Sequence, residues 1–140
     1  MYLFDTNVVS ELRKGTRANA AVGAWAAQTP SEDFRISTIT LLELEIGVLR
    51  LERRDATSGA VLRTWLEEWV LVPFVGRMVD VGITVARGCA ALHVPNTRPE
   101  RDALIAATAL VHGLTVVTRN TADFEPMGVA LLNPWLGPAA

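Results

Sequence analysis

Four acidic side chains stand at positions from which carboxylates could do chemistry together: Asp5, Glu43, Asp102 and Asp123. If the fold gathers them, their mutual repulsion at neutral pH requires a cation. A site made of carboxylate oxygens, without histidine or cysteine ligands, favours Mg²⁺ or Mn²⁺ over zinc. The chemistry that these residue types predict is therefore that of a divalent metal ion.

Each acid also has an ordinary structural explanation. Asp5 is suited to cap the start of a helix, and the run Thr40–Glu43 matches a capping box, in which the glutamate reaches back to the cap residue. Asp102, in the first turn of a predicted helix, complements the positive end of the helix dipole. Asn120 and Asp123 are both turn formers. These explanations suffice for each acid alone, so the metal site depends on all four converging.

Other kinds of active site find no support in the sequence. A single cysteine, Cys89, cannot form an internal disulfide, and no spacing of cysteines or histidines indicates a zinc site. His93 and His112 come late in predicted helices, where histidines cap or pack. Neither a phosphate loop of the form G-x-x-x-x-G-K-S/T nor a G-x-G-x-x-G fingerprint occurs, which disfavours nucleotide-driven and dinucleotide redox chemistry.

Short apolar segments alternate with segments of helical periodicity, which indicates a parallel sheet buried on both faces. Strands are predicted over residues 2–4, 34–37, 70–74, 114–118 and 129–132. Helices are predicted over residues 7–13, 18–28, 40–54, 57–69, 79–92 and 99–113, the last opened by Pro99 and closed by Gly113. The predicted fold class is α/β, with three α/β/α layers around a mostly parallel sheet.

This order of elements brings the acids to one edge of the predicted sheet. Asp5 and the segment 119–124 follow strands, whereas Glu43 and Asp102 open helices. Ligands of such sheets bind beyond the carboxyl ends of the strands, where the strand order reverses. Gly47, one turn beyond Glu43 on the same helix face, predicts the close approach of a backbone or a ligand.

Size and composition set the remaining limits. The length fits one domain over residues 1–140, and no segment reaches the roughly 18 apolar residues that would span a bilayer. With no export signal at its start, the chain is expected to be cytoplasmic. The net charge of −2 gives no global attraction to nucleic acid. Arginine nevertheless supplies 12 of the 13 basic residues, and its planar fork suits phosphate; Arg13, Lys14 and Arg17 form one local basic group.

Four segments in this order, with a characteristic ending, resemble the PIN-domain nucleases, and among them the VapC toxins of bacterial toxin–antitoxin pairs. The segments are residues 4–7, residues 37–47, Asp102 with residues 105–109, and residues 118–124. The ending Asn133-Pro134-Trp135 resembles the FitB-type branch.

The resemblance implies a three-layer PIN domain and a metal-dependent endoribonuclease. Asp5 and Asp102 would bind Mg²⁺ directly, and Asp123 would complete the site directly or through water. Glu43 would orient the attacking water or share a second ion. Family members differ in whether the fourth acid stands at the position of residue 120 or 123; here Asp123 is the acid. Asn120, Thr6 and Asn7 are then supporting polar groups. Attack by water would release a 3′-hydroxyl and a 5′-phosphate.

The resemblance also implies partners. It predicts a VapB-type antitoxin that inserts a segment into the acidic groove, a homodimer, a larger hetero-oligomer with the antitoxin, and DNA binding only through the antitoxin. Two alternatives stay open at this point. One is a PIN-like nuclease that acts on DNA or in RNA processing, because the acids suit any phosphodiester. The other is a non-catalytic scaffold that binds RNA or a partner chain.

Overall fold

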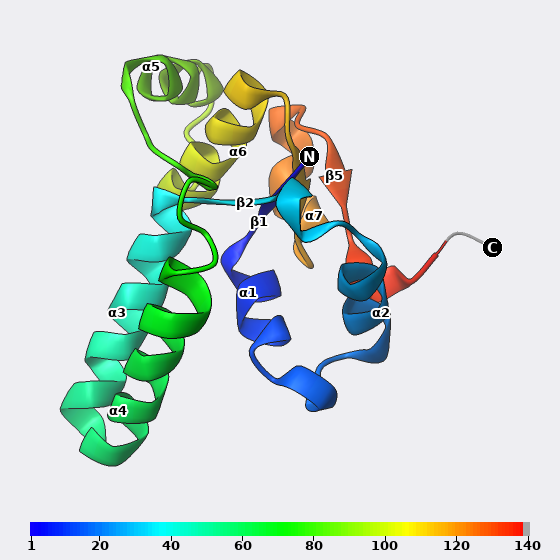
Figure 1. Ribbon diagram of the computed structural model, residues 1–140. Coiled ribbons are helices and arrows are strands. Elements are labelled where there is room, and N and C mark those ends of the chain that lie inside the picture. Colours follow the sequence, from blue (N-terminus) through cyan, green and yellow to red (C-terminus); the bar gives the residue numbers. More distant parts are fainter. Residues whose placement is uncertain (139–140) are drawn as a thin grey trace.

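The computed structural model describes residues 1–138 and forms one five-stranded parallel sheet (Figure 1). The strands are β1 (Tyr2–Phe4), β2 (Phe34–Ser37), β3 (Met78–Val79), β4 (Thr115–Val117) and β5 (Leu131–Leu132). Their order is β3-β2-β1-β4-β5, with Leu3 of the central strand opposite Arg35 on one side and Val116 on the other. The predicted α/β class with a parallel sheet is confirmed.

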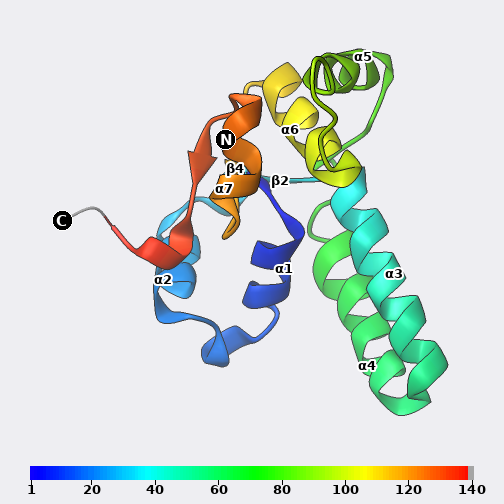
Figure 2. The same ribbon diagram turned by 180° about the vertical axis from the view of Figure 1, so that it is seen from behind.

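Helices cover both faces of this sheet, as Figures 1 and 2 show from opposite sides. They are α1 (Thr6–Leu12), α2 (Ala20–Gln28), α3 (Thr38–Arg54), α4 (Ala56–Trp65), α5 (Ile83–Leu92), α6 (Glu100–His112) and α7 (Thr121–Phe124). Within residues 1–138, none of the helices combines the length and the apolar character needed to cross a bilayer.

The sheet has an apolar core on each face because successive side chains of a strand point to opposite sides. Leu3 and Val116 pack with buried residues of α5, α6 and α7. Their neighbours Phe4 and Val117 pack on the other face with buried residues of α1, α3 and the segment after α4. The three predicted layers are therefore confirmed.

Helix α6 is built to pack closely against the sheet. Its buried face carries small side chains, including Ala103, Ala106 and Ala107, which let the helix approach the strands. Pro99 immediately precedes the helix, and Gly113 ends it in the left-handed conformation with φ of 66°. Glycine adopts this conformation without steric cost, so the predicted start and stop signals of this helix are confirmed.

The predicted strand over residues 70–74 is wrong. The chain forms a π-helical segment over Leu66–Leu71 and then turns, and the Phe74 N–H donates to the Val70 carbonyl at 3.1 Å. Val70 and Phe74 are buried while Val72 is 66% exposed, which is a helical rather than an alternating pattern. The third strand is instead Met78–Val79, which pairs with β2 and delays the start of α5 to Ile83.

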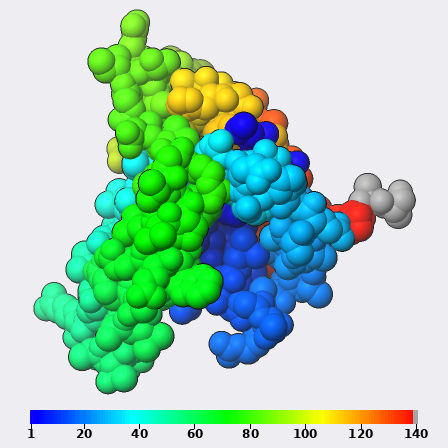
Figure 3. Space-filling view, in the orientation of Figure 1, coloured from blue at the N-terminus to red at the C-terminus, as the bar shows by residue number. Residues whose placement is uncertain are grey.

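Helices α3 and α4 form an arm that extends from the sheet (Figures 1 and 3). Asp55 joins them as the C-cap of α3 and the N-cap of α4, where its carboxylate accepts from the Ser58 N–H at 3.2 Å. Arg63 of α4 also forms ion pairs with two acids of α3: its guanidinium nitrogens lie 2.6 Å from a carboxylate oxygen of Glu45 and 2.9 Å from one of Glu52. These contacts make the arm a rigid hairpin.

The close approach in this arm occurs at Gly59, not at Gly47. A Cβ atom added to Gly59 would lie 2.4 Å from the Cα atom of Glu52, so only glycine allows the two helices to approach there. A Cβ added to Gly47 would meet no atom within 4 Å. No backbone approaches Gly47, because its face of α3 is open; the approach of a ligand there stays a prediction.

Candidate active site

The elements that carry the acidic residues come together where the strand order reverses. The chain runs from β1 outward through β2 to β3 and then returns to β4 on the other side of β1. Asp5 directly follows β1, and Thr118 directly follows β4. Glu43 lies in the second turn of α3, which follows β2, and Asp102 lies in the first turn of α6. A ligand site is expected at this point of an open α/β sheet.

Asp5 is the buried centre of the site. Its backbone N–H donates to the Val117 carbonyl at 2.9 Å, which fixes it between β1 and β4. One carboxylate oxygen accepts from the Thr6 N–H at 2.8 Å, so the residue does cap α1. The other accepts from the Thr118 hydroxyl at 2.8 Å and from the Asn7 amide at 3.3 Å. The carboxylate of Asp5 can therefore cap α1 and belong to the candidate site at the same time.

Burial raises the pKa of Asp5 above its ordinary value, because the charged form loses water. The hydrogen bonds from Thr118 and Thr6 oppose this rise, and the nearby charges of Glu43 and Asp123 add to it. Two acids from distant parts of the chain thus act electrostatically on Asp5.

Glu43 faces the site and does not form the predicted capping box. Ser37 is the N-cap of α3, and its hydroxyl accepts from the Thr40 N–H at 3.2 Å. Thr40 is already within the helix, so Glu43 has no cap residue to reach back to. Its carboxylate instead accepts from the Thr6 hydroxyl at 2.8 Å and lies 3.7 Å from a guanidinium nitrogen of Arg101.

Asp102 carries the largest electrostatic cost among these acids. Partial burial raises its pKa to about 6, with further contributions from Asp5, Asp123 and Glu43, in that order. Because all three charges disfavour ionisation of Asp102, the other three predicted acids lie within electrostatic range of Asp102. Their convergence on one sheet edge, expected from the order of elements, agrees with this coupling.

The two polar residues after β4, Asn120 and Asp123, contribute to the site in different ways. Asp123 is exposed in α7 and acts on Asp5 and Asp102 through its charge. Asn120 contributes its backbone N–H, which donates to the Thr118 hydroxyl at 3.0 Å, and its side chain makes no cap hydrogen bond to α7. Asp123 is thus better placed by charge to face a cation.

The donor chemistry of this site fits a hydrated divalent ion. Within residues 1–138, no three His, Cys, Asp or Glu side chains are gathered tightly enough to form a ready-made cage for an ion. Mg²⁺ usually binds through one or two carboxylates while keeping several waters, so it does not need such a cage. A divalent cation would also relieve the repulsion that raises the pKa of Asp102.

Two residues of the site were not singled out from the sequence. Thr118 supports Asp5 from the end of β4, and Arg101 approaches Glu43 from α6. A threonine at the end of a strand and an arginine beside an acid are both common, so neither gives a distinct signal. Only the pairing of β1 with β4 and the packing of α3 near α6 bring them to the acids.

Replacement of Thr118 by valine tests the support of Asp5. The change keeps the buried shape but removes the hydroxyl that donates to the carboxylate, so we expect the apparent Mg²⁺ affinity in a cleavage assay to fall by about 10- to 100-fold. Thr118→Ser keeps the hydroxyl and serves as the control. Equal Mg²⁺ titration curves for the valine variant and wild type would show that this hydrogen bond is unimportant.

The raised pKa of Asp102 predicts how stability depends on pH and Mg²⁺. The folded chain holds this proton more tightly than the unfolded chain does. Without divalent ions, stability therefore falls as pH rises from 3.8 to about 6. At pH 7.5, Mg²⁺ at a concentration of about 10 to 100 times its Kd should raise Tm by about 3–10 °C. At pH 4 it should have little effect. NaCl of equal ionic strength is the control for screening, and an equal Mg²⁺ effect at both pH values would contradict the prediction.

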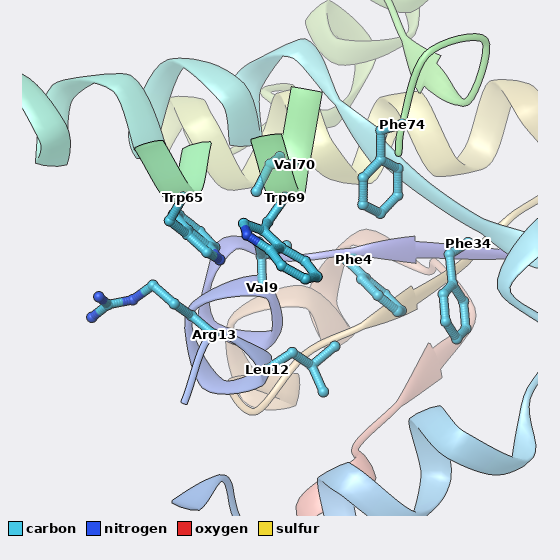
Figure 4. A pocket seen from close by; sticks show the side chains of 9 residues that line it. All are labelled: Phe4, Val9, Leu12, Arg13, Phe34, Trp65, Trp69, Val70 and Phe74. Carbon is cyan, nitrogen blue, oxygen red and sulfur yellow. The ribbon is translucent and has the colours of Figure 1, made fainter. Parts of the chain in front are cut away.

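An apolar hollow opens on the other side of α1, beside the arm (Figures 3 and 4). Its volume is about 210 Å³, and its walls include Phe34, Trp65, Trp69 and Phe74. Trp69 is 70% exposed. Arg13 lies at the edge with its guanidinium 5.7 Å from the centre of the Trp65 ring. None of its lining residues is acidic, so this hollow is separate from the acidic site.

The chain is similar to known proteins over nearly its whole length. A family model described as PIN domain matches residues 2–128. Toxin FitB of Neisseria gonorrhoeae is 38% identical over 141 residues, covering 96% of this chain and 99% of that protein. VapC ribonuclease Y4jK of Sinorhizobium fredii is 34% identical, covering 96% and 98%. The crystal structure of FitAcB from Neisseria gonorrhoeae matches with a TM-score of 0.87 and 37% identity, covering 96% of this chain and 99% of that chain.

Proposed function

This chain belongs to the PIN-domain family, and from that premise we propose that it is the toxin of a toxin–antitoxin pair and a metal-dependent endoribonuclease. The observation that carries the proposal is that the elements bearing the four acids come together at the switch point of the sheet, where burial and the neighbouring acids raise the pKa of Asp5 and Asp102. Such a cluster is costly for the fold, and a divalent ion gives it a chemical use. Residues 1–140 would act as a single domain.

The role proposed for each carboxylate follows from its position. Asp5 and Asp102 would hold Mg²⁺ or Mn²⁺ directly, and Asp123 would do so directly or through water. When bound, the ion lowers the pKa of a water and offsets charge on the scissile phosphate. Thr118 and Asn7 hold Asp5 in place.

Glu43 is suited to orient the attacking water. One of its oxygens is held by Thr6, and the other lies toward Arg101 at 3.7 Å, too far for a strong hydrogen bond. The carboxylate therefore keeps acceptor capacity for a water next to the phosphate. Water as the nucleophile accounts for an active site without a serine or cysteine, and its attack would leave a 3′-hydroxyl and a 5′-phosphate.

The partner proposed is a VapB-type antitoxin, with this chain as a homodimer within a larger hetero-oligomer in the cytoplasm. An antitoxin segment that offers a cation to the acidic groove would meet the charges of Asp5, Glu43 and Asp102. DNA binding would fall to the antitoxin, because this chain has a net charge of −2 and no overall attraction to the duplex.

Expression and cleavage assays test this function. Expression of the chain alone should arrest bacterial growth, and co-expression of its cognate VapB-type antitoxin should restore growth. The purified chain should cleave single-stranded RNA in Mg²⁺, be inactive in EDTA, and leave DNA of the same sequence intact. Comparable cleavage of DNA would favour the alternative nuclease, and soluble, folded protein without toxicity or cleavage would favour the scaffold.

A further inference from the structure

A second, basic hollow begins at the acidic site and follows α1 away from it. Its volume is about 450 Å³. Thr6 and Asn7 form its inner end, and these same residues bind Glu43 and Asp5. Its walls further along include Arg13, Lys14 and Arg119. A chain held at the carboxylates could therefore continue into this hollow without leaving the surface.

The hollow is positively charged although the whole chain is not. Its walls carry three cations, Arg13, Lys14 and Arg119, and one acid, Glu11. The acid is engaged within the protein, since it pairs with Lys14 at 3.1 Å and accepts from the Asn19 N–H at 3.0 Å. Arg13 and Arg119 have no acidic partner among the ion pairs within residues 1–138. The free charge in the hollow thus favours phosphate groups.

Trp135 supplies an aromatic wall that is held in place. The guanidinium of Arg119 lies 5.5 Å from the centre of its ring. The backbone N–H of Trp135 donates to the carboxamide oxygen of Asn133 at 3.0 Å, and the carboxamide nitrogen of Asn133 donates to the Arg119 carbonyl at 3.4 Å. The Arg119 N–H in turn donates to the Asn7 side chain at 3.3 Å. This network connects the aromatic wall to the residue that supports Asp5.

We infer that this hollow is a substrate subsite, in which a nucleotide next to the scissile phosphate stacks its base against Trp135 and Arg119. Arg13 and Lys14 would bind the phosphates that follow. The inference rests on the proposed function and adds the residues that position the strand. Unpaired bases stack on aromatic rings and guanidinium planes, whereas a duplex keeps its bases inside, so the subsite selects single-stranded RNA.

Arg13 extends the path toward the arm. Its side chain lies near Trp65 in Figure 4, with the guanidinium 5.7 Å from the ring centre, so Arg13 and Trp65 form a second arginine–tryptophan pair. The two pairs flank the same helix, α1, and each offers a cation and a π face. Such alternation of cations and aromatic rings is typical of surfaces that follow a single strand.

The decisive measurement is the split between KM and kcat for a short single-stranded RNA. Trp135→Ala should raise KM about tenfold and leave kcat within about twofold, while Trp135→Phe restores KM. Arg119→Ala should also raise KM. Because Arg119 is exposed, this variant should fold normally, so it shows that a rise in KM does not come from misfolding of the tryptophan variant. A dinucleotide keeps the base next to the scissile phosphate but lacks the phosphates that follow, so Trp135→Ala should raise its KM as well, whereas replacement of Arg13 and Lys14 should not.

The phosphate contacts have their own measurement. The logarithm of the RNA binding constant should fall linearly with the logarithm of the salt concentration. Replacement of both Arg13 and Lys14 by alanine should make this slope shallower by about 0.7 for each lost phosphate contact. Replacement of Arg53 and Arg54, exposed at the far end of α3, makes the same change in net charge and should leave the slope unchanged.

Three outcomes would overturn the inference while the proposed function stands. The first is an unchanged KM for RNA in both Trp135→Ala and Arg119→Ala. The second is a loss that falls on kcat rather than on KM, which would place the effect in the catalytic groups. The third is weaker antitoxin binding with unchanged RNA kinetics, which would make the hollow a protein-binding surface. If wild type cleaves no RNA, the proposed function itself fails.

Discussion

The Asp102→Asn variant is expected to cleave RNA more slowly than wild type by a factor on the order of 1000. The amide keeps the size of the side chain but removes the charge that would hold the metal ion. Mutation of a residue that supports a metal ligand usually lowers metal affinity or activity by about 10- to 100-fold, so mutation of the ligand itself should lower activity further. Steady-state cleavage of a fluorescent RNA in Mg²⁺ measures this effect.

Folding should not account for that loss. Asp102 is an acid whose ionisation is disfavoured by burial and three neighbouring carboxylates. Its neutral replacement should therefore have an equal or higher Tm than wild type at pH 7.5 in EDTA. Asp80→Asn, at an exposed acid before α5, is the matched control and should keep full activity. If Asp102→Asn retained more than about a tenth of wild-type activity, its role as a ligand would be refuted.

The Gly59→Ala variant is expected to lower the free energy of unfolding by about 2 kcal/mol, or Tm by about 4–8 °C. Its new methyl group would lie 2.4 Å from the Cα atom of Glu52, and backbone atoms cannot rotate away. The arm helices must separate, which also disturbs the contact of Glu52 with Arg63. This cost exceeds the gain of roughly 1 kcal/mol that alanine brings to a helix interior. Chemical and thermal unfolding measure it.

Gly47→Ala is the matched control for this prediction. It lies in the other helix of the same arm, and an added Cβ would meet nothing within 4 Å. Only the helix propensity then changes, so the variant should be more stable than wild type by about 0.5–1 kcal/mol. Changes of the same sign and size in both glycine variants would contradict the packing described for Gly59.

The sequence was a good guide where local signals and burial agree. Pro99 and Gly113 bound α6 as predicted, and the short apolar runs at 2–4 and 34–37 are strands. The run at 70–74 was misleading because a continuous apolar segment fits a buried helical turn as well as a strand. The edge strand β3 has only two residues, too few for any alternation to show.

The same limit applies to the site. Asp5, Glu43, Asp102 and Asp123 could be named because they stand at the ends of strands or the starts of helices. The capping box at Glu43 was wrong because the local motif cannot show that the N-cap of α3 is Ser37, three residues earlier than Thr40. The hydrogen bond from Thr118 to Asp5 joins residues 113 positions apart and depends on strand pairing. Such contacts follow from tertiary structure and not from any local pattern.

Direct measurement of Mn²⁺ binding tests the metal site most sharply. Paramagnetic resonance of free Mn²⁺ during titration with purified protein reports binding without RNA or catalysis. Wild type should deplete the free signal at neutral pH, Mg²⁺ should compete, and the double variant Asp5→Asn with Asp102→Asn should leave the signal undiminished. Equal depletion by wild type and the double variant would contradict a metal ion held by these carboxylates.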